Sequence, residues 1–374
     1  MALRKIFYGD HTIDAAMRNG FTSGFDYLRI FLSVAVLIWH SATVGLGADF
    51  AKELFADHLR GLVSLILPCF FALSGFLVAG SLLRTTSLVE FAALRGIRLV
   101  PALFVEVVLS ALILGPIVTS VTLSRYFADQ TFFEYFGNMV GRIRMHLPGV
   151  FVGMPAGDVV NASLWTLPYE LECYVVLGLL ALLGLHRRPY VFLLSAVTAN
   201  VGLFLLSHWT QTDYTDRPPG RMLVASFLFG VVLHLFKQRI RLSPAMFAVC
   251  LAATFAFLSF QQTAYLAPAF AAYATVYIGL KNPPKLSFLK RNDLSYGIYL
   301  YAFPIQQTVA FSFPSLNSWW FNVVLALPIT CLFAYVSWNF VEAPFMSNKK
   351  RILSVLKRFD GRIGQPAIGL EEKL

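Results

Sequence analysis

Charged residues are scarce in this chain of 374 residues: they make up 13% of the sequence, against 57% hydrophobic residues. An ordinary soluble domain carries roughly a quarter charged residues, so the composition excludes that class. Cysteine is also scarce, and the four cysteines lie in apolar runs without metal-ligand spacing. We therefore expect free buried thiols, no disulfide framework and no metal site. The first 20 residues hold no apolar core segment, so we expect no cleavable signal peptide.

Long apolar runs are what the sequence has instead. A membrane-spanning helix needs about 20 residues, and a window of that size predicts an all-α, polytopic membrane bundle of about ten transmembrane helices. The predicted spans are 25–45, 61–83, 99–119, 162–184, 189–207, 221–236, 243–260, 264–280, 293–312 and 319–342. No internal repeat is visible, so we divide the chain into an N-terminal segment 1–24, a transmembrane domain 25–345 and a basic tail 346–374.

The basic residues predict the orientation of these spans. If the N-terminus is cytoplasmic, 22 of the 30 lysines and arginines fall in cytoplasmic segments, 7 fall outside, and Arg29 alone lies within a span. Such an excess on one side follows the positive-inside rule and predicts that both termini are cytoplasmic. It also accounts for the net charge of +10 through contact with membrane lipids, without nucleic acid as a partner.

Two gaps between the predicted spans differ from the others. Ser120–Asn161 is long and interrupted by glycine and proline, so we expect an outer loop over the bundle rather than a span. In Arg84–Arg98 the apolar residues recur at helical spacing and basic residues flank them. That pattern predicts an interfacial helix on the cytoplasmic surface, leading into the third span.

The first span carries ionisable residues, which are costly in hydrocarbon: Asp26 and Arg29 at its start and His40 well inside. Arg29 and His40 are 11 residues apart, so they share one helix face and lie about 16 Å apart along its axis. This alignment favours two groups that face a bundle interior or a wet cavity. The alternative is an arginine that extends to the interface and a histidine bonded to a neighbouring helix.

Carboxylates lie in later spans. Glu170 is in the fourth span with Trp165 and Tyr169 close by, and Glu342 is at the foot of the tenth. Glu172 is about 200° from Glu170 around a helix, so the two cannot face one cavity, and we favour Glu170. A histidine and a carboxylate with an arginine below them indicate a proton-handling site. A structural hydrogen bond from Glu170 between helices is the alternative.

Arg95 and Arg98 are three residues apart and share a helix face. Two guanidiniums so placed suit a phosphate-rich ligand, although lipid phosphates are the alternative partner. Ser74 lies beside Gly75 in an apolar span, where small residues mostly allow close helix packing. A serine nucleophile there would lack the G-x-S-x-G context.

The ordered set of motifs resembles a known family. Asp26–Arg29–His40, FFALSGFL, Arg95-x-x-Arg98, SLWTLPYELECY, LSYGIYLYAFPIQQ and FVEAPF occur in the order found in the acyltransferase-3 family of bacterial membrane O-acyltransferases. The resemblance covers the chain from about Phe25 to Phe345. Ala302 departs from it, because many relatives carry a histidine at the corresponding position.

The resemblance implies roles for individual residues. His40 is the implied catalytic base, Arg29 its essential partner, and Glu170 and Glu342 match acidic positions of the family. Arg95 and Arg98 are the implied contacts for the phosphates of acyl-CoA. Asp26, Glu342, Ser74 and Trp165 complete the predicted site as supporting residues.

The implied activity is transfer of an acetyl group from cytoplasmic acetyl-CoA to a hydroxyl of an extracytoplasmic or lipid-linked glycan. The enzyme would lie in the bacterial inner membrane and hold no permanently bound cofactor. We expect His40 to deprotonate the acceptor hydroxyl while Glu170 orients or stabilises its imidazole. A secondary transporter or glycan flippase, with the same residues as a proton relay, is the alternative, although no repeat halves support it.

Overall fold

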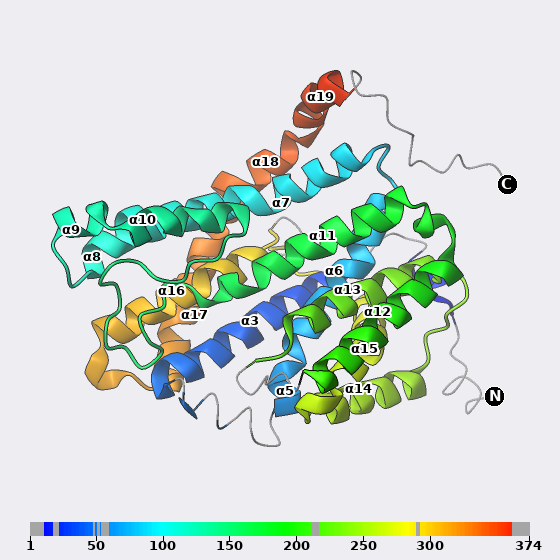
Figure 1. Cartoon of the computed structure of the whole chain (residues 1–374), viewed down its shortest axis with the longest axis horizontal. Coiled ribbons are helices and arrows are strands. Elements are labelled where there is room, and N and C mark those ends of the chain that lie inside the picture. The colour runs from blue at the N-terminus through cyan, green and yellow to red at the C-terminus, as the bar shows by residue number, and fades with distance from the viewer. Residues whose placement is uncertain are drawn as a thin grey trace.

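The computed structural model describes residues 11–17, 22–47, 49–50, 53, 60–210, 217–288 and 292–360. This part of the chain is helical, and its only β-structure is two isolated bridges. The helices are, in chain order, α2 (Ile13–Ala16), α3 (Ser23–Leu46), α5 (Arg60–Ser64), α6 (Ile66–Leu82), α7 (Leu88–Leu109), the π-helical turn η1 (Ser110–Leu114), α8 (Gly115–Val118), α9 (Leu123–Ala128), α10 (Gln130–Tyr135), η2 (Phe136–Val140), η3 (Ala162–Thr166), α11 (Leu167–Leu182), η4 (Leu185–Arg187), α12 (Pro189–Trp209), α13 (Gly220–Leu235), α14 (Pro244–Leu258), η5 (Gln261–Leu266), α15 (Pro268–Gly279), α16 (Ser295–Ser312), η6 (Pro314–Leu316), α17 (Trp319–Ser337), the π-helical turn η7 (Trp338–Glu342), α18 (Ala343–Ser347) and α19 (Lys349–Asp360) (Figure 1).

Six helical segments among the described residues are long and apolar enough to cross a membrane. They are Ser23–Leu46, Arg60–Leu82, Leu88–Val118, Ala162–Leu182, Pro189–Trp209 and Trp319–Ser347. Each coincides with a predicted span, so the all-α class and several of the spans are confirmed. Shorter or less apolar helices, α13 to α16, occupy the other four predicted positions. Ten crossings with both termini in the cytoplasm stay a prediction.

The predicted interfacial helix and the third predicted span form one continuous helix. Residues from Leu88 onward form the first turns of α7, which continues without a break through Arg95 and Arg98 to Leu109. Ser87 caps its N-terminus by accepting a hydrogen bond from the Glu90 backbone N–H. Because Pro101 does not end the helix, Arg95 and Arg98 lie on the same continuous helix as the third predicted span. Whether its first turns lie at the membrane surface stays a prediction.

The core centres on α13, which is buried from Met222 to His234. A helix that is apolar on all sides is stable only when other helices surround it. Glycines allow the closest of these contacts, since a Cβ on Gly75 of α6 would stand 2.0 Å from the Phe227 carbonyl oxygen of α13. A Cβ on Gly230 of α13 would likewise stand 2.1 Å from the Ala72 carbonyl oxygen. Such small residues let helix backbones touch in membranes.

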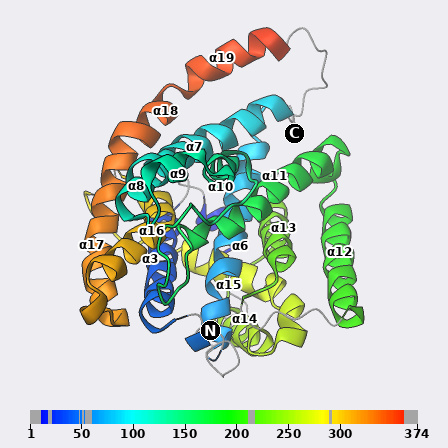
Figure 2. The same cartoon turned by 60° about the vertical axis from the view of Figure 1, so that its left-hand side comes forward.

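A second group of helices, α3, α16 and α17, packs side by side. Figure 2 shows this group on one side of the molecule and α12 at the opposite edge, with α7 above and α14 below. The α13–α6 core lies between α12 and the α3 group. The candidate site lies where these two groups and α7 meet.

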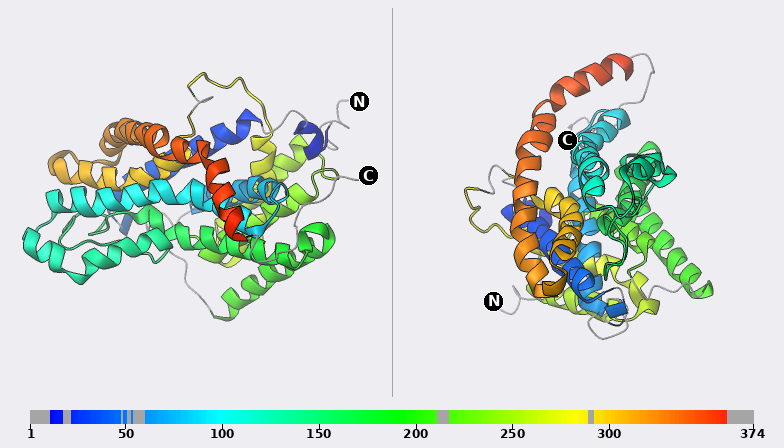
Figure 3. Two further views of the ribbon diagram at one scale, coloured as in Figure 1. Left: turned by 90° about the horizontal axis from the view of Figure 1, so that it is seen from above. Right: turned by 90° about the vertical axis from the view of Figure 1, so that its left-hand side faces the viewer.

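The loop predicted at 120–161 does not span, as expected. It contains α9, α10 and η2, followed by an irregular segment that returns to the bundle. In Figure 3, α9 and α10 lie at the end where α16 passes into α17, and α2 lies at the other end. Phe151 is fully buried in this segment with a φ of 57°, a left-handed conformation that is rare for an aromatic residue.

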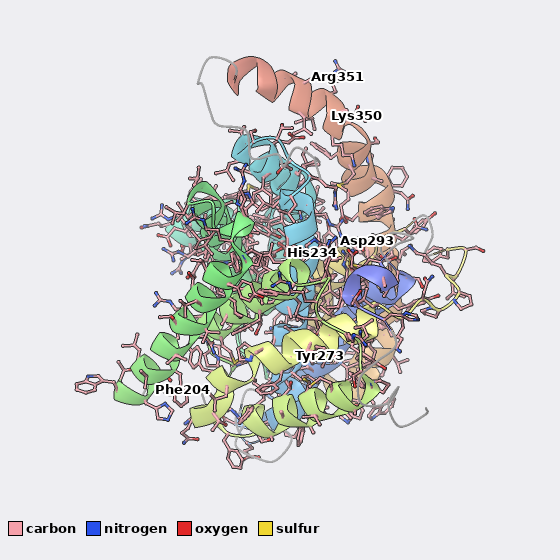
Figure 4. The ribbon with its side chains drawn as sticks, turned by 90° about the vertical axis from the view of Figure 1, so that its right-hand side faces the viewer. Phe204, His234, Tyr273, Asp293, Lys350 and Arg351 are labelled. Atoms are coloured by element: carbon pink, nitrogen blue, oxygen red, sulfur yellow. The ribbon has the colours of Figure 1, made fainter. Side chains whose placement is uncertain are left out.

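The two predicted terminal regions are described only in part. Residues 1–10, 18–21 and 361–374 lie outside the described residues. Asp14 of α2 forms an ion pair of 3.0 Å with Lys237 after α13, so this segment packs on the bundle. Helix α19 follows α18 and packs against α7, with Lys350 and Arg351 on it exposed (Figure 4).

Candidate functional site

A cavity of about 180 Å³ lies between α3, α6, α7, α11 and α16. Three arginines line it, Arg29 of α3 and Arg95 and Arg98 of α7, together with Glu170 of α11. The rest of the lining is mostly apolar and aromatic, from α6, α13 and α16. A cavity with a mainly apolar wall and a few converging charges is the usual form of a ligand site.

Arg29 and Arg98 are held by one carboxylate. Asp293 Oδ2 accepts a hydrogen bond from Arg29 Nη1 at 3.2 Å and another from Arg98 Nη2 at 2.8 Å. Asp293 Oδ1 accepts from the Ser295 hydroxyl at 2.7 Å. Asp293 lies in the segment before α16 and does not line the cavity, so it binds both guanidiniums from outside the cavity.

Burial alone would raise the pKa of Asp293, but the guanidiniums of Arg98 and Arg29 and the hydrogen bonds from Ser295 outweigh it and hold this pKa at about 2. A carboxylate with such a pKa stays ionised at any pH near neutrality. Protonation of Asp293 therefore does not break this bridge near neutral pH.

Arg98 has a second carboxylate partner. Its Nη1 donates to Glu342 Oε2 at 3.0 Å, and the Glu342 side chain is only 2% exposed. The guanidinium also lies 5.7 Å from the ring centre of Tyr296 and 5.7 Å from that of Trp338. Glu342 and Trp338 both belong to the π-helical turn η7, and such turns are frequent at functional sites. Arg98 is thus paired with two carboxylates, one on each terminal nitrogen.

Arg95 differs from Arg98, because it has no carboxylate within ion-pair distance in the described part of the chain. It donates one hydrogen bond, from Nη2 to the Ser81 hydroxyl at 3.1 Å, and its guanidinium lies 6.0 Å from the Phe91 ring centre. Its Nε is buried and has no hydrogen-bond partner among the described residues. Arg95 is therefore a lining arginine without a carboxylate ion pair in that part of the chain, although Glu170 lines the same cavity.

Glu170 lines the cavity and Glu172 does not. Glu170 Oε1 accepts a hydrogen bond of 2.6 Å from the hydroxyl of Tyr174, one turn further along α11. Between the two described residues Glu170 and His40 the structure shows no contact, so the expected carboxylate–histidine pair is not formed. Glu170 is a member of the arginine-lined cavity instead.

His40 lies outside this cavity, further along α3. Its ring is edge-on to Phe303 of α16, with 5.1 Å between ring centres. His40 Nδ1 is buried, and within the described ranges nothing bonds to it. Arg29 and His40 therefore belong to different surroundings on the same helix, one beside the cavity and one about 16 Å beyond it.

The remaining predicted residues divide between the cavity and its surroundings. Ser74 of α6 is in the lining. Asp26 forms an ion pair of 2.6 Å with Lys285 away from the cavity, and Trp165 packs against Tyr169 and lies over Arg217. Asp26 and Trp165 are thus placed at its periphery.

Asp293 is the residue that sequence reasoning missed. It stands at the start of an apolar run, at the same predicted depth as Arg29 and Arg98, and that position was the available signal. Tyr299 also lines the cavity, and its hydroxyl oxygen is 2.7 Å from that of Thr166. Among the described residues no group of three His, Cys, Asp or Glu could hold a metal ion.

Comparison with known proteins gives consistent matches. A family model described as an acyltransferase domain, Acyl_transf_3, matches residues 22–339. The chain is 26% identical over 358 residues to a protein of Shigella phage Sf6 named O-acetyl transferase, covering 88% of this chain and 98% of that protein. It is also 26% identical over 362 residues to Nodulation protein 10 of Rhizobium leguminosarum bv. viciae, covering 90% and 96%. No solved structure matches significantly.

Proposed function

Since this chain belongs to the acyltransferase-3 family and is a membrane acyltransferase, we propose that it transfers an acetyl group from acetyl-CoA to a hydroxyl of a glycan or glycolipid. The donor binds from the cytoplasm and the acceptor lies on the outer side of the bacterial inner membrane. The acetyl group is proposed because the phage relative is named for it.

The observation that carries this proposal is the cavity with three guanidiniums. A hydrophobic cavity wall with concentrated positive charge suits a ligand that joins phosphates to an apolar arm, as acetyl-CoA does. Arg95 is the main phosphate contact in this proposal, because Arg98 is already paired with Asp293 and Glu342. Arg29 is the lining residue on α3, the helix that carries His40 further along.

The chemical step is assigned to His40. Its neutral imidazole takes the proton of the acceptor hydroxyl, and the oxygen attacks the thioester carbonyl. The carbon–sulfur bond then breaks, and the leaving thiolate of coenzyme A receives the proton from the imidazolium. The extended pantetheine arm has a length comparable to the distance of about 16 Å between Arg29 and His40 along α3.

Glu170 has a different place in this mechanism from the one the sequence favoured. It lies with Arg95 and Tyr174 in the cavity, so we assign it to the donor pocket and not to the imidazole. Its carboxylate fixes the Tyr174 hydroxyl and adds a negative charge beside the guanidiniums.

The test uses membranes that contain the chain, incubated with acetyl-CoA labelled in the acetyl group. We expect free coenzyme A to be released while label enters the glycan or glycolipid fraction. The matched control is the His40→Ala variant at equal expression, which should lose transfer. Full label transfer by that variant, or movement of glycan across the membrane without any acetylation, would contradict the proposal.

A further inference from the structure

The outer half of α16 carries two adjacent glutamines, Gln306 and Gln307, that the donor pocket does not use. Both are fully buried. Phe303 stands one turn before them and is the residue that meets the His40 ring. The nitrogen and the oxygen of a buried side-chain amide are normally both hydrogen-bonded. Comparing the partners of the two atoms in each glutamine therefore shows which atom lacks one.

The amide of Gln306 has a fixed orientation. Its Nε2 donates to the Leu37 carbonyl oxygen and to the Ser41 hydroxyl, both at 2.6 Å. Ser41 in turn donates to Asn322 Oδ1 at 3.0 Å, and Asn322 Nδ2 donates to the Gln306 backbone carbonyl at 2.9 Å. A backbone carbonyl can only accept a hydrogen bond, so the nitrogen of the Gln306 amide, and not its oxygen, must face the Leu37 carbonyl. The orientation with nitrogen and oxygen exchanged is therefore excluded.

The amide of Gln307 is fixed in the same way. Its Nε2 donates to the carbonyl oxygens of Gly157 at 3.0 Å and Val159 at 2.9 Å, in the irregular segment that follows α10 and η2. Both amino groups are therefore used, and both Oε1 atoms remain. Each Oε1 is buried, and neither has a hydrogen-bond partner in the part of the chain that the structure describes.

His40 belongs to the same neighbourhood. Leu37 and Ser41, the partners of Gln306, are the α3 residues one turn before and directly after His40. His40 Nδ1 is also buried, and no described residue bonds to it. Two amide oxygens and one imidazole nitrogen around one level of the bundle thus lack a hydrogen-bond partner among the described residues.

We propose that Gln306 Oε1, Gln307 Oε1 and the His40 imidazole form the subsite that receives the hydroxyl groups of the acceptor. This assignment rests on the proposed function. It gives a binding site to the acceptor, whereas the arginine-lined cavity is assigned to the donor. Hydroxyls bring the donors that these atoms lack, whereas phosphates and carboxylates bring only further acceptors. The subsite therefore selects a neutral, hydroxyl-rich molecule such as a saccharide and rejects the anionic donor.

The outer segment forms the wall of this subsite. Met154, Ala156 and Val159 pack against the small apolar cluster that contains Phe303. Gly153 and Gly157 adopt φ values of 78° and 81°, which only glycine takes readily, so the segment is shaped by its sequence. Gln307 ties this wall to α16, and an acceptor reaches His40 past it.

The test replaces the two glutamines separately by leucine, which has similar bulk and no polar atoms. Two quantities are measured on purified protein in detergent. The first is the apparent KM for a titrated glycolipid extract of the membranes in which the wild type acts, with labelled acetyl-CoA as donor. The second is the dissociation constant for coenzyme A alone.

We expect either variant to raise the KM for the extract at least about tenfold, with the coenzyme A constant within about twofold of wild type. Thr308→Val is the matched control, since the Thr308 hydroxyl bonds only the Pro304 carbonyl within α16. It should leave both quantities unchanged.

Two results would overturn the subsite. One is an unchanged KM for the extract in both leucine variants. The other is a parallel loss of coenzyme A binding and thermal stability, which would make the glutamines structural. A wild type that binds no coenzyme A and transfers no label rejects the proposed function itself, and the subsite is rejected with it.

Discussion

Asp293 and Arg29 form an ion pair of 3.2 Å across 264 positions of the sequence, and the carboxylate oxygen that makes it also binds Arg98 at 2.8 Å. This one atom joins the start of α3 to the middle of α7 beside the cavity. It directs the remaining N–H groups of the two guanidiniums, because a planar guanidinium held on one edge has a defined orientation.

Asp293→Asn should weaken donor binding. The variant keeps the shape of the side chain and removes the charge, so Arg29 and Arg98 lose their common orientation. We expect the KM for acetyl-CoA to rise about tenfold, equivalent to about 1.4 kcal/mol, with a smaller change in kcat. The control is Asp26→Asn, one turn from Arg29, whose partner is Lys285. Equal effects of the two variants would contradict the role of Asp293.

Donor binding should not depend on Asp293 ionisation near neutrality. A carboxyl whose pKa is lowered from 3.8 to about 2 contributes its stabilisation fully above the usual value and loses it only as the pH falls towards the lowered one. The dissociation constant of coenzyme A should therefore show no Asp293-dependent change between about pH 5 and pH 8. A wild-type transition in this window that Asp293→Asn abolishes would disagree.

Arg95→Ala should lower donor affinity more than any other single change in the cavity, because Arg95 is the guanidinium without a carboxylate partner. We expect at least a tenfold weaker coenzyme A constant, about 1.4 kcal/mol. Arg95→Lys keeps the charge and loses the fork, so it should fall in between. Arg188→Ala, at an exposed arginine after α11, is the control. Wild-type affinity in Arg95→Ala would rule out the phosphate contact.

Glu170→Gln and Glu172→Gln form a matched pair on α11. Only Glu170 lines the cavity and bonds Tyr174 at 2.6 Å. We expect Glu170→Gln to change the KM for acetyl-CoA several-fold while Glu172→Gln leaves it at the wild-type value. Steady-state kinetics on purified protein decide it, and a larger effect at Glu172 would reverse the assignment.

Gly75→Ala should destabilise the α6–α13 contact. Its Cβ would stand 2.0 Å from a backbone oxygen of Phe227, and backbone cannot turn aside as a side chain can. Overpacking of this kind costs about 1–3 kcal/mol, which a thermal melt in detergent detects. In the control Gly202→Ala no heavy atom lies within 4 Å of the new Cβ, so its melting temperature should not fall. Equal melting temperatures of Gly75→Ala and Gly202→Ala would contradict the close backbone contact between α6 and α13.

Sequence reasoning reached the local features of the site. The continuous α3 with Arg29 and His40 on it follows from an apolar run with two exceptions, because hydrocarbon excludes unpaired charge. Helix periodicity predicts that only one of Glu170 and Glu172 faces a cavity, and the neighbouring aromatic residues favoured Glu170. The lining of the cavity includes Glu170 and not Glu172. The family followed from the order of the motifs and was confirmed by the match over residues 22–339.

Contacts between residues that are distant in the sequence could not be predicted from the sequence pattern. No spacing relates Asp293 to Arg29 or Glu342 to Arg98, because those pairs exist only when α3, α7, α16 and α17 pack together. The same packing separates Glu170 from His40, which similar depth alone had brought together. The sequence also did not show that α7 is one continuous helix. A helix that is amphipathic at one end and apolar at the other has the sequence pattern of two separate elements.

The sequence by itself determined a helical membrane acyltransferase, because apolar length, the placement of its few charges and the order of its motifs are properties of the linear chain. Only the tertiary structure decided which arginines form ion pairs with carboxylates, and which amide oxygens of α16 have no hydrogen-bond partner among the described residues. Those properties depend on which residues each side chain contacts across the bundle. A buried polar group without a hydrogen-bond partner is costly, so it favours a ligand that supplies the partner.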